Sequence, residues 1–475
     1  MDQPPHVLMF PLPMQGPLNA TLKLAHLLCL GGLHITFLLT HHIHARLLRH
    51  SNIQSYPAFR IRTISDGLPE NHPRGADNYL ELFESLRTKT PPLFKQLLQT
   101  GTPISCVIAD GVLGFTFDVA NEIGIPIFDV RTLSPACLWI FFSLPNLIHS
   151  RDLPFKGDDL DVMVKGVPGM ERYLRRRDLP SFCRSGDLDN PSIRFYQTET
   201  IQNPRACGLI LNTFDELDAP ILSVMHNICP NIYTIGPLHA HLKAKLAAAS
   251  SPLPTFSNNL WEEDRSCLTW LDSQPLKSVL YVSFGSLAIV NKDQLMEFWH
   301  GLVNSGQRFL WVMRPDSEAG ESQIPVELSQ GTKERGYIVG WAPQEEVLAH
   351  PAVGGFLTHG GWNSTLESIH EGVPMICWPY FVDQQINSRL VEEEWKLGFD
   401  MKDICDRSVI EEKIRNVMET RKDGLSKSIE HMANLAKRSL SEGGSSYTHL
   451  ERLIQDIKTK CKRGRVDDSS RNEIL

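Results

Sequence analysis

The chain has 475 residues, more than one hydrophobic core usually supports, so at least two domains are expected. An apolar content of 42% and a charged content of 21% are ordinary for a globular protein, and a net charge of −8 argues against nucleic acid or an anionic membrane as the main partner. The ten cysteines stand singly, without a CxxC pair or zinc-ligand spacing, which indicates free thiols in a reducing compartment.

The N-terminal segment does not read as a signal peptide, because it has no basic region and its apolar run is short and broken by proline. No stretch reaches the ~20 apolar residues needed to span a bilayer. The nearest, residues 24–39, is interrupted by two histidines and two glycines. We therefore predict a cytoplasmic protein without a transmembrane segment, and we expect a monomer.

The first half of the chain alternates apolar strands with helices. Residues 6–12 read as a buried strand, 19–30 as a helix that ends at two glycines, and 33–39 as a second strand. This order predicts a parallel sheet with right-handed crossovers. Further strands of this half are expected at 107–110, 126–130, 209–211 and 231–238.

A segment at 239–260, rich in Ala, Ser, Pro and Lys, is typical of a linker. A second α/β run follows, with expected elements at 266–271, 279–284, 295–303 and 309–313. Two doubly wound domains would bind ligands in the cleft outside the carboxyl ends of their strands. We assign 1–238 to an N-terminal domain and 261–457 to a C-terminal domain whose last helix, at 448–457, is expected to pack back on the N-terminal domain, and we expect 458–475 to be a disordered polar tail.

The most informative turn is Thr358-His359-Gly360-Gly361, which joins an apolar run to a segment that reads as a helix. A helix start offers unpaired backbone N–H groups and the positive end of the helix dipole, and glycines let a ligand approach the backbone. The turn therefore predicts an anion site. Considered alone, the same letters also fit an ordinary turn between a strand and a helix.

Around this turn the sequence resembles, position for position, the long signature of plant secondary-product UDP-glycosyltransferases. The matching positions are Trp341, Pro343, Gln344, His359, Trp362, Asn363, Ser364, Glu367, Pro379, Asp383 and Gln384. The segments VSFGS at 282–286, TWLD at 269–272, RDLP at 177–180 and IGPL at 235–238 extend the resemblance over residues 6–457. The resemblance, to glycosyltransferase family 1, implies the α/β GT-B fold: two Rossmann-like, doubly wound domains that face each other across a cleft. It also implies inversion at the anomeric carbon, with no metal and no cofactor beyond the co-substrate UDP-glucose.

In the C-terminal half, the resemblance implies the site for the nucleotide. Trp341 would stack on uracil, and Gln344 would pair with the base or the ribose. Glu367 lies one helical turn beyond Asn363 and would accept both ribose hydroxyls. Singly, Trp341 also fits a core residue and Glu367 a solvated one. The complete implied donor set is Ser286, Trp341, Ala342, Gln344, His359, Gly361, Trp362, Asn363, Ser364, Glu367, Tyr380, Asp383 and Gln384.

The same resemblance implies where the diphosphate and the sugar bind. Side chains of His359, Asn363, Ser364 and Ser286 would meet the diphosphate, whose departure needs fixed donors, each worth ~3–4 kcal/mol. The sugar would meet Trp362, Asp383 and Gln384. In the family, glutamine at this last position accompanies glucose.

The first loop between a strand and a helix, Gln15-Gly16-Pro17, departs from the family pattern. Pro17 stands where the family usually has the histidine that takes the proton from the acceptor hydroxyl. Proline suits the first turn of a helix, but losing a general base typically costs ~10²–10⁴ in rate. Asp110 matches the aspartate that orients this histidine, so we name Asp110 and the position of Pro17 as catalytic.

Other histidines could act as the base in place of a histidine at position 17. His26 is out of phase with position 17 on the expected helix and faces away from it. His41 and His42 follow the second strand at its carboxyl end, and we name His42 as a substitute base, although this segment also reads as an ordinary polar helix start.

An acidic acceptor would need less help from a base. A carboxylic acid is ionised at pH 7, and a hemiacetal or a phenol is more acidic than an alkyl alcohol, so Asp110 could suffice. We therefore expect simple alkyl alcohols to be poor acceptors. The N-terminal stretch also resembles members that act on iridoids or related terpenoids. As acceptor-binding residues we name Gln15, Phe115, Trp139 and Phe142, which suggest a small apolar molecule.

Other classes remain as alternatives. A metal-dependent GT-A transferase would use a DxD motif, and Asp159-Leu160-Asp161 and Asp187-Leu188-Asp189 match it in polar loops. A protein without activity, which only binds a nucleotide sugar or a small terpenoid, would explain Pro17. An NAD-dependent enzyme is set aside, because the first turn lacks GxGxxG.

Overall fold

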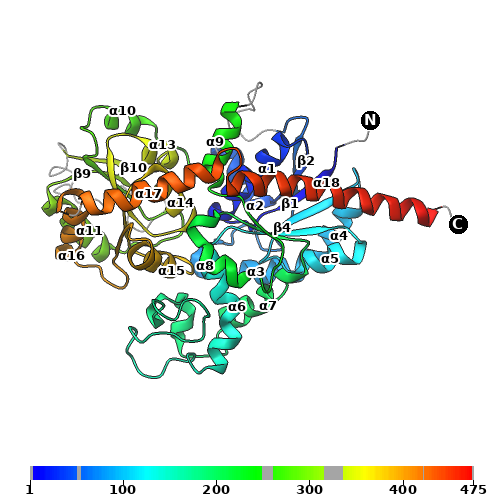
Figure 1. The fold of residues 1–475 in the computed structure, drawn as a ribbon, viewed down its shortest axis with the longest axis horizontal. Helices are drawn as coiled ribbons and strands as arrows, with labels where there is room; N and C mark the ends of the chain where they lie inside the picture. The colour runs from blue at the N-terminus through cyan, green and yellow to red at the C-terminus, as the bar shows by residue number, and fades with distance from the viewer. Residues whose placement is uncertain (1–3, 51–54, 249–259, 315–334, 421, 473–475) are drawn as a thin grey trace.

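The computed structural model describes residues 4–50, 55–248, 260–314, 335–420 and 422–472, and it contains two parallel sheets flanked by helices (Figure 1). The N-terminal sheet has seven strands in the order β3-β2-β1-β4-β5-β6-β7, and the C-terminal sheet has six in the order β10-β9-β8-β11-β12-β13. The strands of the first are β1 (His6–Phe10), β2 (His34–Thr40), β3 (Phe59–Ile64), β4 (Cys106–Asp110), β5 (Ile127–Arg131), β6 (Leu209–Leu211) and β7 (Ile232–Thr234). Those of the second are β8 (Val279–Ser283), β9 (Arg308–Val312), β10 (Gly336–Val339), β11 (Val353–Thr358), β12 (Met375–Cys377) and β13 (Gly398–Asp400).

Helices follow most strands, as parallel pairing requires. In the N-terminal half they are α1 (Gln15–Leu30), α2 (His41–His50), α3 (Tyr79–Lys89), α4 (Pro91–Gln99), α5 (Phe115–Ile123), α6 (Pro135–His149), α7 (Pro191–Thr200), α8 (Asp215–Met225) and α9 (Leu238–Ala248). In the C-terminal half they are α10 (Ser266–Asp272), α11 (Lys292–Ser305), α13 (Gln344–Ala349), α14 (Trp362–Glu371), α15 (Gln384–Arg389), α16 (Arg407–Arg415), α17 (Lys422–Leu440) and α18 (Ser445–Asn472). The predicted α/β class with two doubly wound sheets is confirmed.

Both faces of the N-terminal sheet are buried, which explains the unbroken apolar run of β1. Val7 and Met9 point to one face, where they pack with the leucines of α1. Leu8 and Phe10 point to the other face, where they pack with the apolar side chains of α3 to α6. Successive residues of a strand alternate between faces, so a strand buried on both sides must be apolar throughout.

In each sheet, the direction of the strand order reverses next to the first strand of that sheet. β1 lies between β2 and β4, and β8 lies between β9 and β11. Loops at the carboxyl ends of the two central strands diverge at such a point and open a crevice for ligands. Asp110 ends β4, and His359 follows β11, so the two most informative sequence positions lie at the two switch points.

The last two helices, α17 and α18, run from the C-terminal half to the N-terminal half (Figure 1). Leu450, Leu453 and Ile454 of α18 pack in the same core cluster as Val7 and Met9. Helix α18 therefore contributes to the core on one face of the N-terminal sheet.

Helices cover part of each of the two segments that were expected to be irregular. Residues 239–248 of the predicted linker form most of helix α9, with Leu238 and His241 buried. Its Ala, Leu and Lys residues are strong helix formers, which outweighs the linker-like composition. The predicted disordered tail is helical from 458 to Asn472, because α18 continues from its docked turns. Residues 249–259 and 473–475 of those two predictions lie outside the described residues.

Three smaller expectations can also be checked. His26 is a core residue, with 3% of its surface exposed and its Nδ1 3.0 Å from the Tyr56 hydroxyl. None of the ten cysteines forms a disulfide bond, as predicted. Among the described residues, no helix is both long and apolar enough to cross a bilayer.

Candidate active site

A cavity of about 1010 Å³ lies between the two halves and is lined by residues from both. The N-terminal half contributes the loop after β1, including Pro17, together with Asp110 at the end of β4. The C-terminal half contributes the loop after β8 and the turn around His359. The cavity therefore joins the carboxyl ends of both sheets, where the strand orders predict ligands.

Most of the predicted donor residues line this cavity. They are Ser286, Trp341, Ala342, Gln344, His359, Gly361, Trp362, Asn363, Ser364, Glu367, Asp383 and Gln384. Tyr380 is the exception, because its ring packs against the apolar cluster on one face of the C-terminal sheet. Its backbone N–H donates to the side-chain oxygen of Gln384 at 2.8 Å, so it positions that residue from behind.

The imidazole of His359 is held between two glycines. A Cβ at Gly285 would lie 2.5 Å from the His359 ring, and one at Gly361 would lie 2.4 Å from its Nε2. No side chain fits at either position while the ring stays there. Burial, assisted by the positive Arg314, lowers the pKa of His359 to about 4. The ring is therefore neutral at pH 7, with one N–H donor and one acceptor nitrogen, and it also interacts with the backbone of Ser283.

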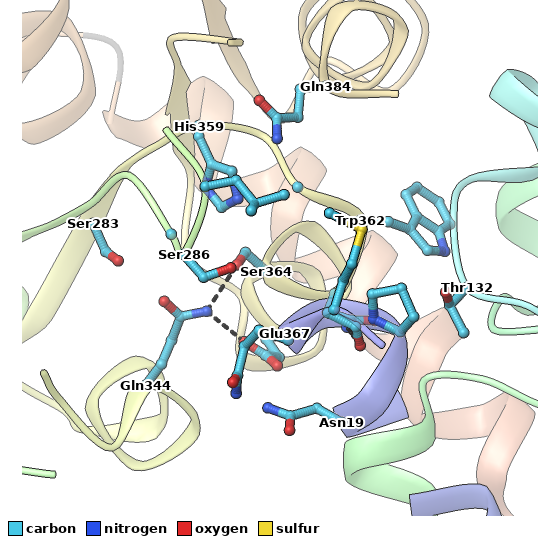
Figure 2. Close-up of a pocket in the computed structure, with 18 of the residues that line it drawn as sticks. Asn19, Thr132, Ser283, Ser286, Gln344, His359, Trp362, Ser364, Glu367 and Gln384 are labelled. Carbon is cyan, nitrogen blue, oxygen red and sulfur yellow. Dashed lines mark hydrogen bonds between the residues drawn. The ribbon is translucent and has the colours of Figure 1, made fainter. Parts of the chain in front are cut away.

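Gln344, Ser364 and Glu367 form a hydrogen-bonded group at the start of α13 and along α14 (Figure 2). The Gln344 amide nitrogen donates to Ser364 Oγ at 2.8 Å and to Glu367 Oε2 at 2.7 Å. Burial and the neighbouring Glu345 raise the pKa of Glu367 to about 7, against the opposing effect of Lys23. A ligand with two hydroxyls could replace the amide as the donor to this carboxyl group.

Trp341 presents one face to another aromatic ring. Trp261 stacks on it with ring centroids 4.7 Å apart and an angle of 23° between the planes. The guanidinium of Arg46 lies over Trp261, 4.9 Å from the ring centroid. A base that stacks on Trp341 would therefore use its other face.

Asn363 and Trp362, at the start of α14, connect the two halves. The Asn363 amide nitrogen donates to the carbonyl of Gly16 at 2.9 Å, and its oxygen accepts from the Asn212 amide at 3.1 Å. The indole N–H of Trp362 donates to the carbonyl of Asn212 at 2.7 Å. The side chains of both residues are hydrogen-bonded to other parts of the protein. At this helix start, a diphosphate could therefore bind to the backbone N–H groups of the two residues.

Gln384 and Asp383 are oriented by their neighbours. The Gln384 oxygen accepts the backbone N–H groups of Tyr380 and Phe381, both at 2.8 Å, which leaves its NH₂ group for a ligand. Asp383 accepts from the Asn387 amide at 3.0 Å, and burial raises its pKa to about 6. One donor group and one acceptor group side by side suit the hydroxyls of a sugar.

On the acceptor side, Pro17 lies in the first turn of α1 and Asp110 faces the same cavity. Asp110 is 3% exposed, and its Oδ1 accepts the backbone N–H of Val112 at 3.0 Å. Burial raises the pKa of Asp110, and the nearby Arg131 opposes this shift. A carboxylate with a raised pKa is a stronger base than an exposed one.

Four predicted acceptor-side or catalytic residues do not line the cavity. His42 is in α2, where burial and the guanidinium of Arg74 lower its pKa. Phe115 packs edge-on against Phe10 and Phe94, while Trp139 donates its indole N–H to the carbonyl of Pro168 at 2.8 Å. Phe142 packs beside Trp139. These aromatic side chains serve the core, and the position of His42 outside the cavity lining gives no support to a role as the base. Of the predicted acceptor residues, Gln15 alone lines the cavity.

The structure adds residues that the sequence analysis missed. Both Arg131, the last residue of β5, and Thr132, which follows it, line the cavity. Thr132 lies opposite Ser286 in the close-up of Figure 2. Asn19 also faces the cavity, and its side-chain oxygen is buried with no hydrogen-bond partner among the described residues. Lys23, one turn further along α1, pairs with Glu345 at 2.5 Å. The signal for Arg131 was available, since it is a charge at the carboxyl end of an apolar strand.

The two DxD motifs lie elsewhere. Asp161 pairs with Arg177 at 2.7 Å, Asp189 pairs with Arg194, and neither motif lines the cavity. A metal ion could be held instead by His239, His370 and Glu371, whose ligand atoms lie within 4.8 Å of one another, but these residues are also outside the cavity lining. The structure thus gives no support to a GT-A arrangement in this cavity.

Comparisons with known proteins agree with this geometry. Residues 256–423 match the family described as UDP-glucoronosyl and UDP-glucosyl transferase. A 7-deoxyloganetic acid glucosyl transferase of Catharanthus roseus is 55% identical over 471 residues, covering 96% of this chain and 98% of that protein. A myricetin 3-O-rhamnoside 1,2-glucosyltransferase of Crocosmia x crocosmiiflora is 46% identical, with 96% of each chain covered. The crystal structure of Os79 from O. sativa in complex with UDP superposes with a TM-score of 0.82 and 29% identity, covering 95% of this chain and 100% of that one. The chain is therefore a member of the plant UDP-glycosyltransferase family, with the GT-B fold and the glucosyltransferase activity of that family.

Proposed function

We propose that this enzyme transfers glucose from UDP-glucose, with inversion, to a hydroxyl group of a small iridoid acid of the kind named for its relatives, 7-deoxyloganetic acid. The observation that carries the proposal is the single cavity that combines a nucleotide-sugar half with an acceptor half containing Asp110 but no histidine at position 17. An acceptor whose attacking hydroxyl is more acidic than that of an alkyl alcohol, as in a hemiacetal, fits this incomplete catalytic pair.

In the donor half, the proposed roles follow from the contacts. Uracil stacks on the open face of Trp341, the ribose hydroxyls bind Glu367, and the diphosphate lies at the start of α14 beside His359. As the bond from the anomeric carbon to the diphosphate breaks, negative charge grows on UDP. Neutral His359 and the backbone N–H groups of the helix start stabilise that charge without having to reorganise.

In the acceptor half, Asp110 is the proposed general base. The acceptor oxygen attacks the anomeric carbon from the face opposite UDP, its proton passes to Asp110, and the configuration inverts. A hemiacetal hydroxyl, as in an iridoid, gives up its proton more easily than an alkyl alcohol does. The raised pKa of Asp110 brings its basicity closer to what the transfer needs.

The proposal includes three properties of the whole protein. Transfer needs no metal, since the helix start and His359 supply the charge stabilisation. The enzyme works as a monomer, because one chain contributes both halves of the cavity. It acts in the cytosol, where ten cysteines without a disulfide stay reduced. Activity in excess EDTA and light scattering on the purified enzyme test the first two.

The direct experiment is an acceptor screen with UDP-glucose, UDP-galactose and UDP-glucuronic acid as donors. We expect UDP-glucose with 7-deoxyloganetic acid to give the highest kcat/KM and a β-glucoside. If the enzyme turned over no iridoid but glucosylated a flavonoid glycoside efficiently, the proposed acceptor class would be wrong. The assignment of UDP-glucose as the donor would still hold. Loss of activity in EDTA, restored by a divalent cation, would overturn the metal-independent mechanism.

A further inference from the structure

Arg131 is a buried cation that faces the acceptor side of the cavity. It ends β5, the strand next to β4, and lines the cavity together with Asp110 and Tyr196. Only 1% of its surface is exposed. A guanidinium carries five N–H donors, and a buried one normally has them satisfied.

The guanidinium of Arg131 lacks such partners. None of its three nitrogen atoms has a hydrogen-bond partner among the described residues. Its nearest ion-pair partner is Asp110, with 3.9 Å between Arg131 Nη1 and Asp110 Oδ1, which is beyond hydrogen-bond reach. Asp110 therefore balances part of the charge of Arg131 without occupying its donors.

Two other carboxyl groups near Arg131 do not occupy its donors either. Burial raises the pKa of Asp129 to about 8, so this side chain is largely protonated at pH 7. Burial raises the pKa of Glu199 to about 7, and its Oε2 accepts the backbone N–H of Gly114 at 2.8 Å. The donors of Arg131 thus remain for a ligand that enters the cavity.

We propose that Arg131 binds a carboxylate carried by the acceptor, so that the enzyme selects acids over their neutral esters. This inference rests on the proposed function, since it concerns the acceptor of the same reaction. A planar carboxylate matches the guanidinium fork and can accept two of its N–H groups at once. The N-terminal half also contributes apolar side chains to the lining of the same cavity, which fits the carbon skeleton of a small terpenoid: Leu12, Met14, Phe83, Val112 and Leu133.

The proposal also determines which acceptor group is glucosylated. A carboxylate held by two N–H groups has its lone pairs engaged and is a poor nucleophile. The attacking atom is then a hydroxyl of the same molecule, and the product keeps a free carboxylate. The bound negative charge also raises the pKa of Asp110, which strengthens it as the base for that hydroxyl.

The test compares 7-deoxyloganetic acid with its methyl ester in the wild type, Arg131→Gln and Arg131→Lys. We expect the wild type to prefer the acid. In Arg131→Gln, kcat/KM for the acid should fall about 30-fold or more, mainly through KM, while the value for the ester changes less than about threefold. Arg131→Lys should recover part of the loss, because it keeps the charge and loses the fork.

Controls separate binding from folding. Arg205→Gln removes an exposed arginine, paired with Asp118 on the surface, and should leave the acid and the ester unchanged. The affinity for UDP, which binds the other half, reports whether Arg131→Gln is folded. The double variant Arg131→Gln/Asp129→Asn removes a neighbouring carboxyl and should show the same selective loss of the acid.

Parallel losses for acid and ester would mean that Arg131 is only a structural counter-ion, and they would overturn the proposal. So would a wild type that prefers the ester, or an alkali-labile glucose ester as the product. If the wild type turns over neither compound, the proposed function fails. The carboxylate site is then tested separately by calorimetry, which measures binding of the acid to the UDP-loaded enzyme. Binding of the acid that weakens about 30-fold or more in Arg131→Gln would still support the carboxylate site, and no binding to the wild type would overturn it.

Discussion

Asp110 and Arg131 end two adjacent parallel strands, with 3.9 Å between Asp110 Oδ1 and Arg131 Nη1, and both face the cavity between the two halves. The pair lines the same cavity as Pro17, which stands at the position of the family's usual histidine. A carboxyl group and a cation therefore lie side by side where we propose that the acceptor binds.

Replacing Asp110 with Asn should lower kcat by about 10²–10⁴ while the affinity for UDP stays the same, because the base is lost and the nucleotide half is untouched. In the wild type, kcat/KM should fall as the pH drops through the raised pKa of Asp110, above the ordinary value of 3.8. Steady-state kinetics from pH 4 to 9 measure both effects. Asp118→Asn, on the exposed side of α5, is the matched control and should behave like the wild type. An Asp110→Asn enzyme with normal kcat would exclude this aspartate as the base.

Replacing Pro17 with His should broaden the acceptor range. The imidazole would enter the cavity in the first turn of α1, where Asp110 can orient it, so a plain alkyl alcohol such as 1-octanol should gain up to about 10²–10⁴ in rate. UDP release with 1-octanol measures the gain. If the wild type already glucosylates this alcohol efficiently, Pro17 does not limit the chemistry. A wild type without activity on any acceptor, together with an active Pro17→His variant, would favour a binding protein.

Gly361→Ala should act through His359. The new Cβ would lie 2.4 Å from His359 Nε2 and would displace the ring. We expect kcat to fall about 10²–10³, as for loss of one donor to the leaving group. His359→Ala should cost about the same, and the double variant should lose little more, because both remove one interaction. Additive losses in this double-mutant cycle would show that the two residues act independently.

Binding of UDP-glucose should depend on pH through Glu367. Its pKa is raised to about 7, and we expect ribose hydroxyls to donate to the ionised form. Affinity should therefore increase about tenfold from pH 6 to pH 8, as the carboxyl group loses its proton. Calorimetry with UDP-glucose measures this, since its diphosphate does not titrate in that range.

Glu367→Gln should bind UDP-glucose more weakly and lose the dependence on pH. Glu84→Gln, an exposed residue of α3, is the control and should keep the wild-type profile. A flat wild-type profile would mean that the ribose does not bind the ionised carboxylate.

The C-terminal half of the site was predictable from the sequence because most of its side chains come from one stretch, which runs from Trp341 through α13, β11 and α14 to the start of α15. His359, Glu367 and Gln384 keep their spacing whatever the rest of the chain does. Their mutual contacts were not predictable. Nothing in the sequence indicates that the Gln344 amide holds Glu367, or that the side chain of Asn363 bonds to Gly16 across the cleft.

The acceptor half was harder to predict because its lining comes from many separate segments. Phe115 and Trp139 were chosen as aromatic residues near Asp110, but the helices that carry them turn these side chains to the core. Arg131 was missed because the predicted strand stopped one residue before it. Composition alone did not indicate helix α9 at 239–248, since Ala and Lys are common in both linkers and helices.

The central claim is glucose transfer to a hydroxyl of an iridoid acid by a cavity without the family's histidine. The most direct measurement is NMR of the product formed from UDP-glucose and 7-deoxyloganetic acid by the purified enzyme in excess EDTA. We predict one equivalent of UDP and a β-glucoside that withstands mild alkali and retains its carboxylic acid. No UDP release, or a glucose ester on the carboxyl group, would contradict the account.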